Sequence, residues 1–393
     1  MEQIREYPSE FAKPLLLCFD LLLNRCNIGF FDENVPFAVE YWRFGYMIPM
    51  VVIQYLSSTA YIFQVSTGPV KTSELAYMLP VYLIQIQSLF KALIIIPKRR
   101  EISQLVTRLG STWRLQNLTE NQIAKKCKLL KKLNLNHVVF YWGSIIATYL
   151  HLITPLVLTL YRTFVLNQQS ALQLPFASVY PFDPVQNWFT YLITYAIQTY
   201  PMLITAYFYI GTELLMITLC AYVTTEFTIL REDLLEVGAF RDEVNSTRGL
   251  EQTGPIPIQE LTMQLDNIFN RMIFVNLLFA TVTNCFFAFG ATVSTPGLLD
   301  KFNNYAAVLV LMFPIHVFCF YGDLLKEESA GIAASAYENL WYRGNTRYQK
   351  IISFIIMRSQ RACCLTSMEY TPITLKTFTK VSSLIYVVRW QGN

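Results

Sequence analysis

The chain has 393 residues, of which 53% are hydrophobic and only 15% are charged, and its formal net charge is +4. About a quarter of the residues of an ordinary soluble domain are charged, so this composition excludes that class and favours a polytopic membrane protein. The small positive charge does not indicate nucleic-acid binding, because Lys and Arg in membrane proteins mark the cytoplasmic loops.

Seven segments are apolar and long enough to be candidate membrane-spanning helices, because a helix needs about 20 mostly apolar residues to cross lipid hydrocarbon. Alternation with a period of two residues is absent, so a β-barrel is not expected. The fourth segment exceeds one crossing and is expected to tilt strongly or to project from the membrane. In chain order the candidates are Tyr41–Phe63, Glu74–Ile96, His137–Val165, Trp188–Phe227, Phe269–Val293, Phe302–Leu325 and Pro372–Trp390.

Two further segments are predicted to be helices outside the lipid. Leu15–Leu23 is short, is interrupted by Asp20 and lacks a small-residue cleavage site, so we expect a helix packed at the inner membrane face rather than a signal peptide. Leu115–Asn136 has one apolar stripe between lysines and is expected to extend the third span into the cytoplasm. No cysteine lies in a predicted outside loop, which favours reduced thiols without disulfides.

Basic residues indicate the orientation in the membrane. The loop from Pro97 to Asn136 contains ten Lys and Arg residues, whereas the opposite side offers Lys71 and Lys301, with Arg162 near a membrane edge. By the positive-inside rule the basic loops are cytoplasmic. The N-terminus is then cytoplasmic and, after seven spans, the C-terminus is extracellular.

The sixth span runs without a turn into a charged segment rich in small residues. We expect this segment to continue as a cytoplasmic helix packed against other cytoplasmic helices, the alternative being a solvated amphipathic helix. Lysines of the third span's extension are candidate partners for Glu327 and Glu328. Tyr337 and Trp341 are four residues apart, a spacing that places both side chains on one helical face. That face is predicted to contribute to subunit assembly.

The sequence lacks the motifs of common catalytic and cofactor sites. No Gly-rich phosphate loop, His-Glu-x-x-His, Cys-x-x-Cys or Gly-x-Ser-x-Gly is present. We therefore expect no catalytic residues, no metal, no cofactor and no enzymatic activity. Glu213, within the long fourth segment, lies either inside the membrane or near its inner end.

The last third of the chain carries a family resemblance. Five short motifs stand in the order found in insect odorant receptors. They are Phe313-Pro314, Phe320-Tyr321-Gly322-Asp323, Glu328-Ser329, Ala336-Tyr337 and Trp341. The run Met357–Arg361 is similar to that family's Arg-x-Gln step, with Ala362 where proline is frequent. The segment from Phe378 to Arg389 occupies the place of the family's tail motif and matches it loosely. The chain thus resembles an insect odorant receptor.

This resemblance implies a subunit of an odorant-gated, non-selective cation channel in the plasma membrane of sensory-neuron dendrites. Four subunits would surround a pore built by the last helix of each, and a cytoplasmic anchor would join them. Some of the four would be copies of a shared co-receptor. The short loop Phe227–Asn267 favours the ligand-selective subunit. A gustatory-type channel, a G-protein-coupled receptor and a transporter are the alternatives. A G-protein-coupled receptor requires an extracellular N-terminus, and a transporter should show repeats and broken helices.

An odorant subunit needs an apolar, aromatic-lined cavity with few polar groups. The outer halves of the second, third, fourth and sixth spans supply candidates for it, although each could instead be a packing residue. A neutral small volatile ligand is expected. The candidates are Met78, Tyr82, Tyr149, Ile153, Tyr195, Gln198, Tyr200, Val308 and Met312.

The last span is the least apolar and is predicted to line the pore. Steps of three or four residues place one stripe of side chains along this helix. The stripe is polar at both ends and has an apolar ring at Val387. A water-filled vestibule with a hydrophobic gate requires such a pattern. The tail resemblance also implies that Val387 forms the gate. Alternatively, the lysines reach the headgroups and the stripe packs against helices. The stripe contains Lys376, Lys380, Ser383, Leu384, Val387 and Gln391.

Together these observations predict an all-α membrane protein with seven transmembrane helices extended into a cytoplasmic anchor. Residues 1–40 form the cytoplasmic N-terminal segment and 41–325 a six-helix ligand-binding bundle with cytoplasmic extensions. Residues 326–371 form the anchor and 372–393 the pore-lining last helix.

Overall fold

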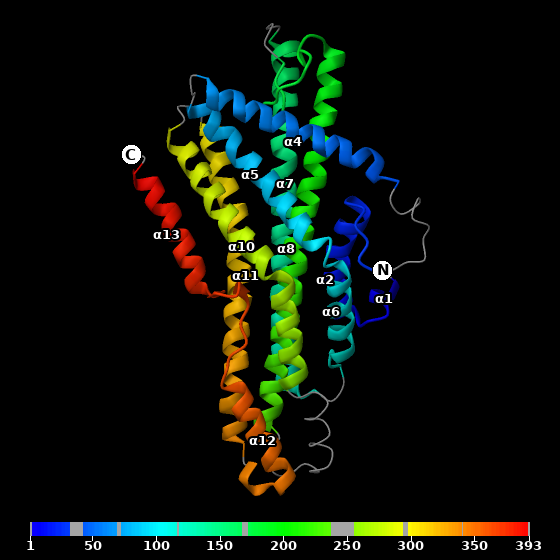
Figure 1. Ribbon diagram of the computed structural model, residues 1–393, viewed down its shortest axis with the longest axis vertical. Helices are drawn as coiled ribbons and strands as arrows, with labels where there is room; N and C mark the ends of the chain where they lie inside the picture. Colours follow the sequence, from blue (N-terminus) through cyan, green and yellow to red (C-terminus); the bar gives the residue numbers. More distant parts are fainter. Residues whose placement is uncertain are drawn as a thin grey trace.

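The computed structural model describes residues 2–31, 42–68, 72–115, 118–166, 172–236, 255–293, 298–339 and 341–391, which are almost entirely helical (Figure 1). The longer helices are α2 (Ser9–Asp20), α4 (Phe44–Thr67), α5 (Thr72–Ile95), α6 (Arg99–Thr112), α7 (Glu120–Leu160), α8 (Trp188–Glu236), α10 (Pro255–Val293), α11 (Leu298–Glu338), α12 (Thr346–Ser359) and α13 (Leu375–Gln391). The short elements are α1 (Glu2–Arg5), π-helical turns at Leu21–Arg25 and Tyr161–Val165, a 3-10 turn at Trp341–Arg343, and the antiparallel strands β1 (Thr366–Ser367) and β2 (Thr371–Pro372).

The seven predicted spans all coincide with helices. Within the described residues, α4, α5, α7, α8, α10 and α11 each contain a stretch long and apolar enough to cross a membrane. The seventh predicted span is α13, which is shorter and more polar. The prediction of an all-helical, multi-pass membrane protein is therefore confirmed.

Four helices are much longer than one membrane crossing. α8 has 49 residues, α7 and α11 have 41 each, and α10 has 39. At about 1.5 Å per residue, α8 is about 74 Å long. Hydrocarbon of about 30 Å accounts for less than half of that length. The predicted extensions of the third and fourth spans are thus confirmed as continuous helices that, with α12, form the narrow lower end of the molecule in Figure 1.

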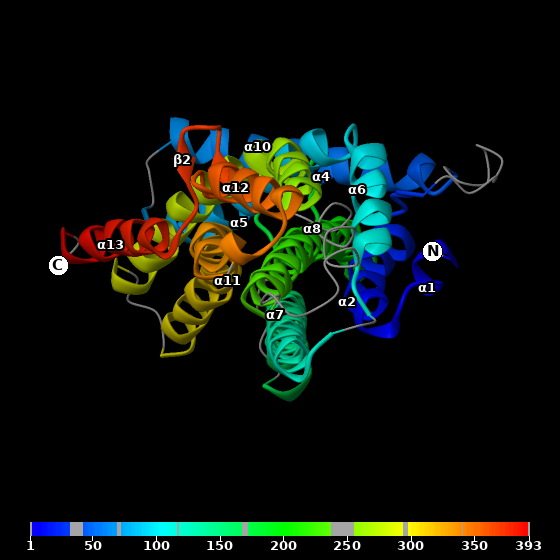
Figure 2. The same cartoon turned by 90° about the horizontal axis from the view of Figure 1, so that it is seen from below.

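Helix α8 is the central element of the bundle. It packs against α11, α7, α10 and α2, and its residues from Phe208 to Leu230 are almost all buried. A helix that is apolar on every side needs neighbours on every side, and Figure 2 shows α8 enclosed in this way.

The N-terminal helix α2 packs against α8, as expected of Leu15–Leu23. Phe11 stacks on Tyr222 with ring centroids 4.7 Å apart, and the Tyr222 hydroxyl donates to the Phe11 carbonyl oxygen at 2.6 Å. Trp113, beyond the end of α6, contacts both rings. These buried aromatic contacts join α2 and the end of α6 to the centre of α8.

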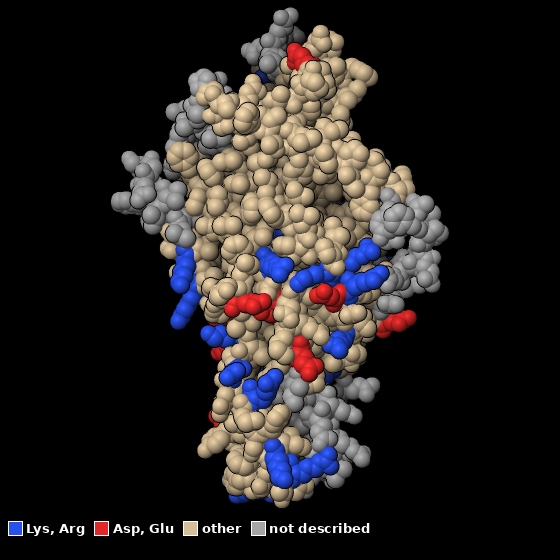
Figure 3. Space-filling model, viewed as in Figure 1, with Lys and Arg blue, Asp and Glu red and all other residues tan. Residues whose placement is uncertain are grey.

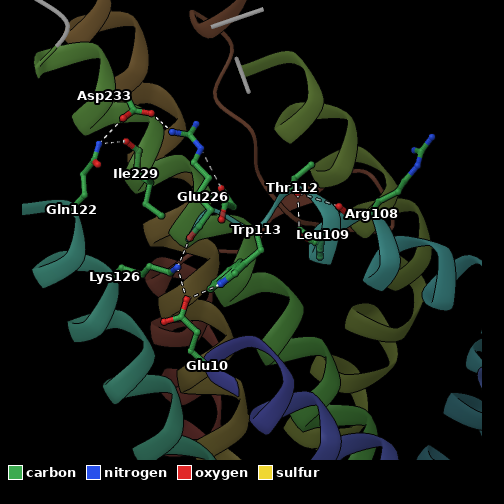
Figure 4. A network of polar contacts seen from close by, with 11 residues as sticks. Glu10, Arg108, Leu109, Thr112, Trp113, Gln122, Lys126, Glu226, Ile229 and Asp233 are labelled. Atoms are coloured by element: carbon green, nitrogen blue, oxygen red, sulfur yellow. Dashed lines mark hydrogen bonds and ion pairs between the residues drawn. The ribbon is translucent and has the colours of Figure 1, made fainter. Parts of the chain in front are cut away.

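A charged cluster strengthens the same junction (Figure 4). Lys126 of α7 lies 2.5 Å from Glu10 of α2 and 4.5 Å from the centroid of the Trp113 ring. The Trp113 indole nitrogen also donates to Glu10 at 2.9 Å. Further along α8, Arg114 pairs with Asp233, and Gln122 donates to Asp233 at 2.6 Å. Lys126 thus has its partner on α2, and the adjacent Lys125 pairs with Glu232 of α8.

Charged side chains are distributed unevenly along the molecule. On the face shown in Figure 3, Lys, Arg, Asp and Glu gather over the lower half, whereas the upper half is almost entirely uncharged apart from its top. A broad uncharged surface beside a charged end is the pattern of a membrane protein with a part that projects from the lipid.

The sixth span and the charged segment after it form one continuous helix, α11. This helix extends to Glu338, as expected, but it ends before Trp341. The Asn339 side-chain amide donates to the Leu234 carbonyl oxygen at 2.8 Å and to the Tyr348 hydroxyl at 3.0 Å. Trp341 then begins a separate 3-10 turn.

Two details of the anchor therefore differ from expectation. Tyr337, 71% exposed, and the partly buried Trp341 do not share a helical face. The basic partner of Glu328 also differs from expectation. Its carboxylate lies 3.4 Å from the guanidinium of Arg231 on α8 and, among the described residues, does not pair with a lysine of α7. Lys132 of α7 instead lies 3.4 Å from the centroid of the Phe320 ring.

Candidate ligand cavity and pore-facing helix

A cavity of about 320 Å³ lies among α5, α7, α8, α10 and α11. Helices α7 and α11 contribute small side chains at the same level, so space remains between neighbouring helices. Gly143 and Ala147 are four residues apart on one face of α7. The lining residues are Val81, Ile84, Gly143, Ser144, Ile146, Ala147, Thr148, Leu150, His151, Met202, Thr205, Ala206, Tyr209, Ile210, Phe287, Asn304, Ala306, Ala307, Val310 and Leu311.

The walls of the cavity are mainly apolar and uncharged. None of the described lining residues is Asp, Glu, Lys or Arg. Ser144, Thr148, Thr205, Tyr209 and Asn304 add neutral polar groups at separated points. Two of these hydroxyls are bonded within their own helices, from Thr148 to the Ser144 carbonyl oxygen and from Thr205 to the Pro201 carbonyl oxygen, both at 2.8 Å. Such a site suits a small neutral ligand held mainly by apolar contact.

A segment between α7 and α8 covers the side of the cavity near Val81 and Leu152. Phe176 is buried beside these two residues, and its ring centroid lies 5.3 Å from that of His151. Gln198 of α8 fixes the backbone of Phe176 by accepting from its nitrogen at 3.2 Å and donating to its oxygen at 3.0 Å. The connection between α7 and α8 is therefore anchored to the bundle at this point.

The nine predicted ligand residues surround the cavity rather than line it. Met78 and Tyr82 line a second pocket of only about 10 Å³, and Gln198 fixes the covering segment. Val308 and Met312 each stand one residue after a lining residue of α11. One residue corresponds to a turn of about 100° around a helix, enough to move a side chain off the cavity wall.

The other four candidates have different contacts. The hydroxyls of Tyr149 and Tyr207 are 3.1 Å apart, with Tyr149 38% exposed. Tyr195 donates to the Leu152 carbonyl oxygen. The remaining two are Ile153, which is half exposed, and Tyr200, whose ring lies 5.9 Å from that of Tyr46.

Below the cavity, α5 and α8 are joined by a buried ion pair. Lys91 has no exposed surface and its ammonium pairs with Glu213. The same nitrogen lies 3.8 Å from the centroid of the Tyr209 ring, and Tyr209 is a lining residue of the cavity. Glu213, whose position was open from sequence, is thus enclosed in the bundle with a charged partner.

Helix α13 packs against α10 and α11. Phe378 contacts His316 of α11 with ring centroids 5.0 Å apart, and Val381 is buried. Lys376 and Lys380 are exposed, as is Ser383, so the first half of the predicted stripe faces away from the bundle. The backbone of the second half is helical, but the side chains of Leu384, Val387 and Gln391 lie outside the described residues.

The start of α13 crosses α11 at the aromatic-Gly-acid motif. A Cβ placed on Gly322 would lie 2.9 Å from the carbonyl oxygen of Ile373. Only glycine allows this approach without displacing backbone. Earlier in the chain, Thr366 is fixed to α10. It donates to Asp266 through its backbone nitrogen at 2.6 Å and through its hydroxyl at 2.8 Å.

Comparison with known families identifies the class of protein. The family described as 7tm Odorant receptor matches residues 71–386. The chain belongs to this odorant receptor family, as its motifs indicated, and it is a multi-pass membrane receptor rather than an enzyme.

Curated relatives agree with this assignment. Odorant receptor 92a of Drosophila melanogaster is 29% identical over 216 residues, 54% of this chain and 52% of that protein. Odorant receptor 85c of the same species is 26% identical over 54% of this chain and 55% of its own length. The match therefore spans about half the length of these relatives. An odorant receptor coreceptor of Ooceraea biroi is 23% identical over only 32% of this chain and 26% of its own, so the similarity is greater to specific receptors than to co-receptors.

The fold is shared with a solved receptor along its whole length. The olfactory receptor OR5 from Machilis hrabei in complex with eugenol superposes with a TM-score of 0.78, covering 99% of this chain and 98% of that one at 10% identity. A second structure of OR5 gives a TM-score of 0.74 over 95% and 96% of the two chains, at 12% identity.

Proposed function

We propose that this protein is the odorant-binding subunit of a ligand-gated, non-selective cation channel that assembles with a co-receptor. The observation that carries the proposal is the uncharged cavity of about 320 Å³ inside the bundle of an odorant receptor family member. A cavity of that size and lining takes a small neutral organic molecule. The structurally similar OR5, which was solved in complex with eugenol, supports this ligand class.

The cavity lining supplies the ligand contacts in this proposal. The predicted residues Met78, Tyr82 and Gln198 act around it, by lining the small neighbouring pocket and holding the covering segment. Apolar contact provides most of the affinity, at about 25 cal/mol for each Å² of apolar surface removed from water. The separated hydroxyl and amide groups orient a single polar group of the ligand.

The pore is formed by α13 from each subunit. Lys376 and Lys380, at the start of the predicted stripe, are exposed and so can line a shared axis. Four copies of these lysines around one axis would repel a cation, whereas copies diluted by co-receptor subunits would not. The subunit therefore conducts poorly as a homotetramer and well as a heteromer.

Subunits meet through the cytoplasmic anchor. Tyr337 of α11 is 71% exposed, and Phe354 and Met357 of α12 are also exposed apolar residues. Such side chains at the narrow, charged end of the molecule suit a protein interface. Trp341, packed partly against the core, supports that face rather than forming it.

Cavity-filling substitutions test the ligand site. With the co-receptor coexpressed, Ala147→Leu and Ala307→Leu should lower the potency of every odorant agonist, because both fill the cavity. The exposed Leu309→Ala is the matched control and should preserve potency. Currents evoked by direct activation of the co-receptor should be unchanged in all three. Wild-type agonist potency in both filled variants would refute the site.

A further inference from the structure

The inner end of the cavity is closed by an aromatic ring. Helix α7 runs upward in Figure 1, whereas α5, α8 and α11 run downward. Among these four helices, the lowest lining residues are therefore the first of α7 and the last of α5, α8 and α11. Gly143, Ile84, Leu311 and the neighbouring Tyr209 and Ile210 occupy this level. Tyr209 is the largest of them and only 8% of it is exposed.

The Tyr209 ring rests against a buried cation. Lys91 stands seven residues beyond Ile84 on α5, two turns further down, and its ammonium lies 3.8 Å from the centroid of the ring. An ammonium attracts the electron-rich face of an aromatic ring, most strongly where water is excluded. Both side chains have almost no exposed surface here, so the contact restricts where the ring can lie.

Glu213 fixes the position of that cation. It stands four residues after Tyr209 on the same face of α8 and pairs with Lys91. Replacing a buried ion pair by an apolar pair of similar volume is often neutral or stabilising, because burying two charges costs solvation energy. The pair is therefore weak evidence for stability, and its position beneath the ring points to a role there.

We propose that the Lys91–Glu213 ion pair holds the Tyr209 ring as the inner wall of the cavity, and that this wall sets the length of ligand that the receptor accepts. The inference rests on the proposed ligand site. Tyr209 is then the specificity-determining residue and Lys91 its positioning residue. The ligands discriminated are neutral molecules of one chemical type that differ in chain length.

The probes are straight-chain primary alcohols and their acetate esters, applied to the receptor coexpressed with its co-receptor. Tyr209→Leu removes the ring and should move the most potent member of each series to a longer chain. Potency should rise about fourfold for each additional methylene that the deepened cavity buries. Tyr209→Phe retains the ring and should retain the wild-type preference. An unchanged preference in Tyr209→Leu would overturn the inner-wall assignment.

The ion pair is tested without leaving an unpaired buried charge. The double variant Lys91→Leu with Glu213→Leu should shift the preferred length in the same direction as Tyr209→Leu, whereas Lys91→Arg should keep it. Surface labelling confirms that each variant reaches the membrane. A double variant with the wild-type length preference would refute the positioning role of Lys91, even if Tyr209→Leu shifts it.

Ala307→Leu separates this inference from the proposed function. It narrows a side wall and should weaken agonists of all lengths. If Ala307→Leu and Tyr209→Leu both behave as wild type, the cavity is not the ligand site. If only Ala307→Leu weakens the agonists, the site stands and the inner-wall inference fails.

Discussion

Gly322 of α11 lies directly against the backbone of Ile373, two residues before α13 begins. The aromatic-Gly-acid motif is thus the point at which the chain that leads into α13 crosses α11. Gly322→Ala would place a methyl group 2.9 Å from the Ile373 carbonyl oxygen and displace that backbone. We expect altered gating, measured as a change in basal current and in maximal odorant response. Gly45→Ala is the matched control, because nothing lies within 4 Å of its added Cβ.

The exposed lysines of α13 should influence ion selectivity. Lys380→Glu replaces a positive charge on the proposed pore face with a negative one, so divalent permeability should rise relative to monovalent permeability. Reversal potentials in calcium and sodium solutions measure the change. Lys128→Glu, on the exposed surface of α7, should leave them unaltered. Equal permeability ratios in Lys380→Glu and wild type would mean that this face does not line the pore.

The junction between α2 and α7 should depend on Lys126. Its side chain is 4% exposed, and its ammonium contacts Glu10 and the Trp113 ring, so Lys126→Met should cost about 1–3 kcal/mol. The neighbouring Lys125, 51% exposed, pairs with Glu232, and Lys125→Met should cost at most about 1 kcal/mol. Thermal unfolding of the purified receptor compares the two variants. Equal unfolding temperatures would show that the junction tolerates loss of the buried cation.

The chain ends should lie on opposite sides of the membrane. A peptide tag after Asn393 should be reached by antibody on intact cells, because an odd number of spans separates it from a cytoplasmic N-terminus. A tag before Met1 should become accessible only after permeabilisation. The reverse labelling would support the orientation of a G-protein-coupled receptor.

Much of the fold could be predicted because its signals are local. Each apolar run became a helix, and the lysine-rich segment Leu115–Asn136 became the lower part of α7 from Glu120 onward. The end of α11 could not be predicted in this way. It depends on Asn339 bonding to Leu234 and Tyr348, residues that lie far away or beyond the turn.

The predicted ligand residues stay a prediction, and they stand around the cavity rather than along its wall. The prediction rested on aromatic residues such as Tyr149 and Tyr195, whereas the space lies beside Gly143, Ala147 and Ala307. Small residues recurring on one face were the available signal. Hydrophobic periodicity does not reveal which face is inward when a helix is apolar on all sides. The Lys91–Glu213 pair likewise joins residues on α5 and α8 that no local pattern connects.

Odorant-evoked current in excised patches tests the central claim most directly. Outside-out patches containing this subunit and its co-receptor should respond to an agonist in solutions without GTP or other nucleotides. A ligand-gated channel needs no soluble messenger, so the response should reverse near zero millivolts in symmetrical cation solutions and should be abolished by Ala307→Trp. Loss of the response on excision, with its return when GTP is supplied, would contradict the ligand-gated channel.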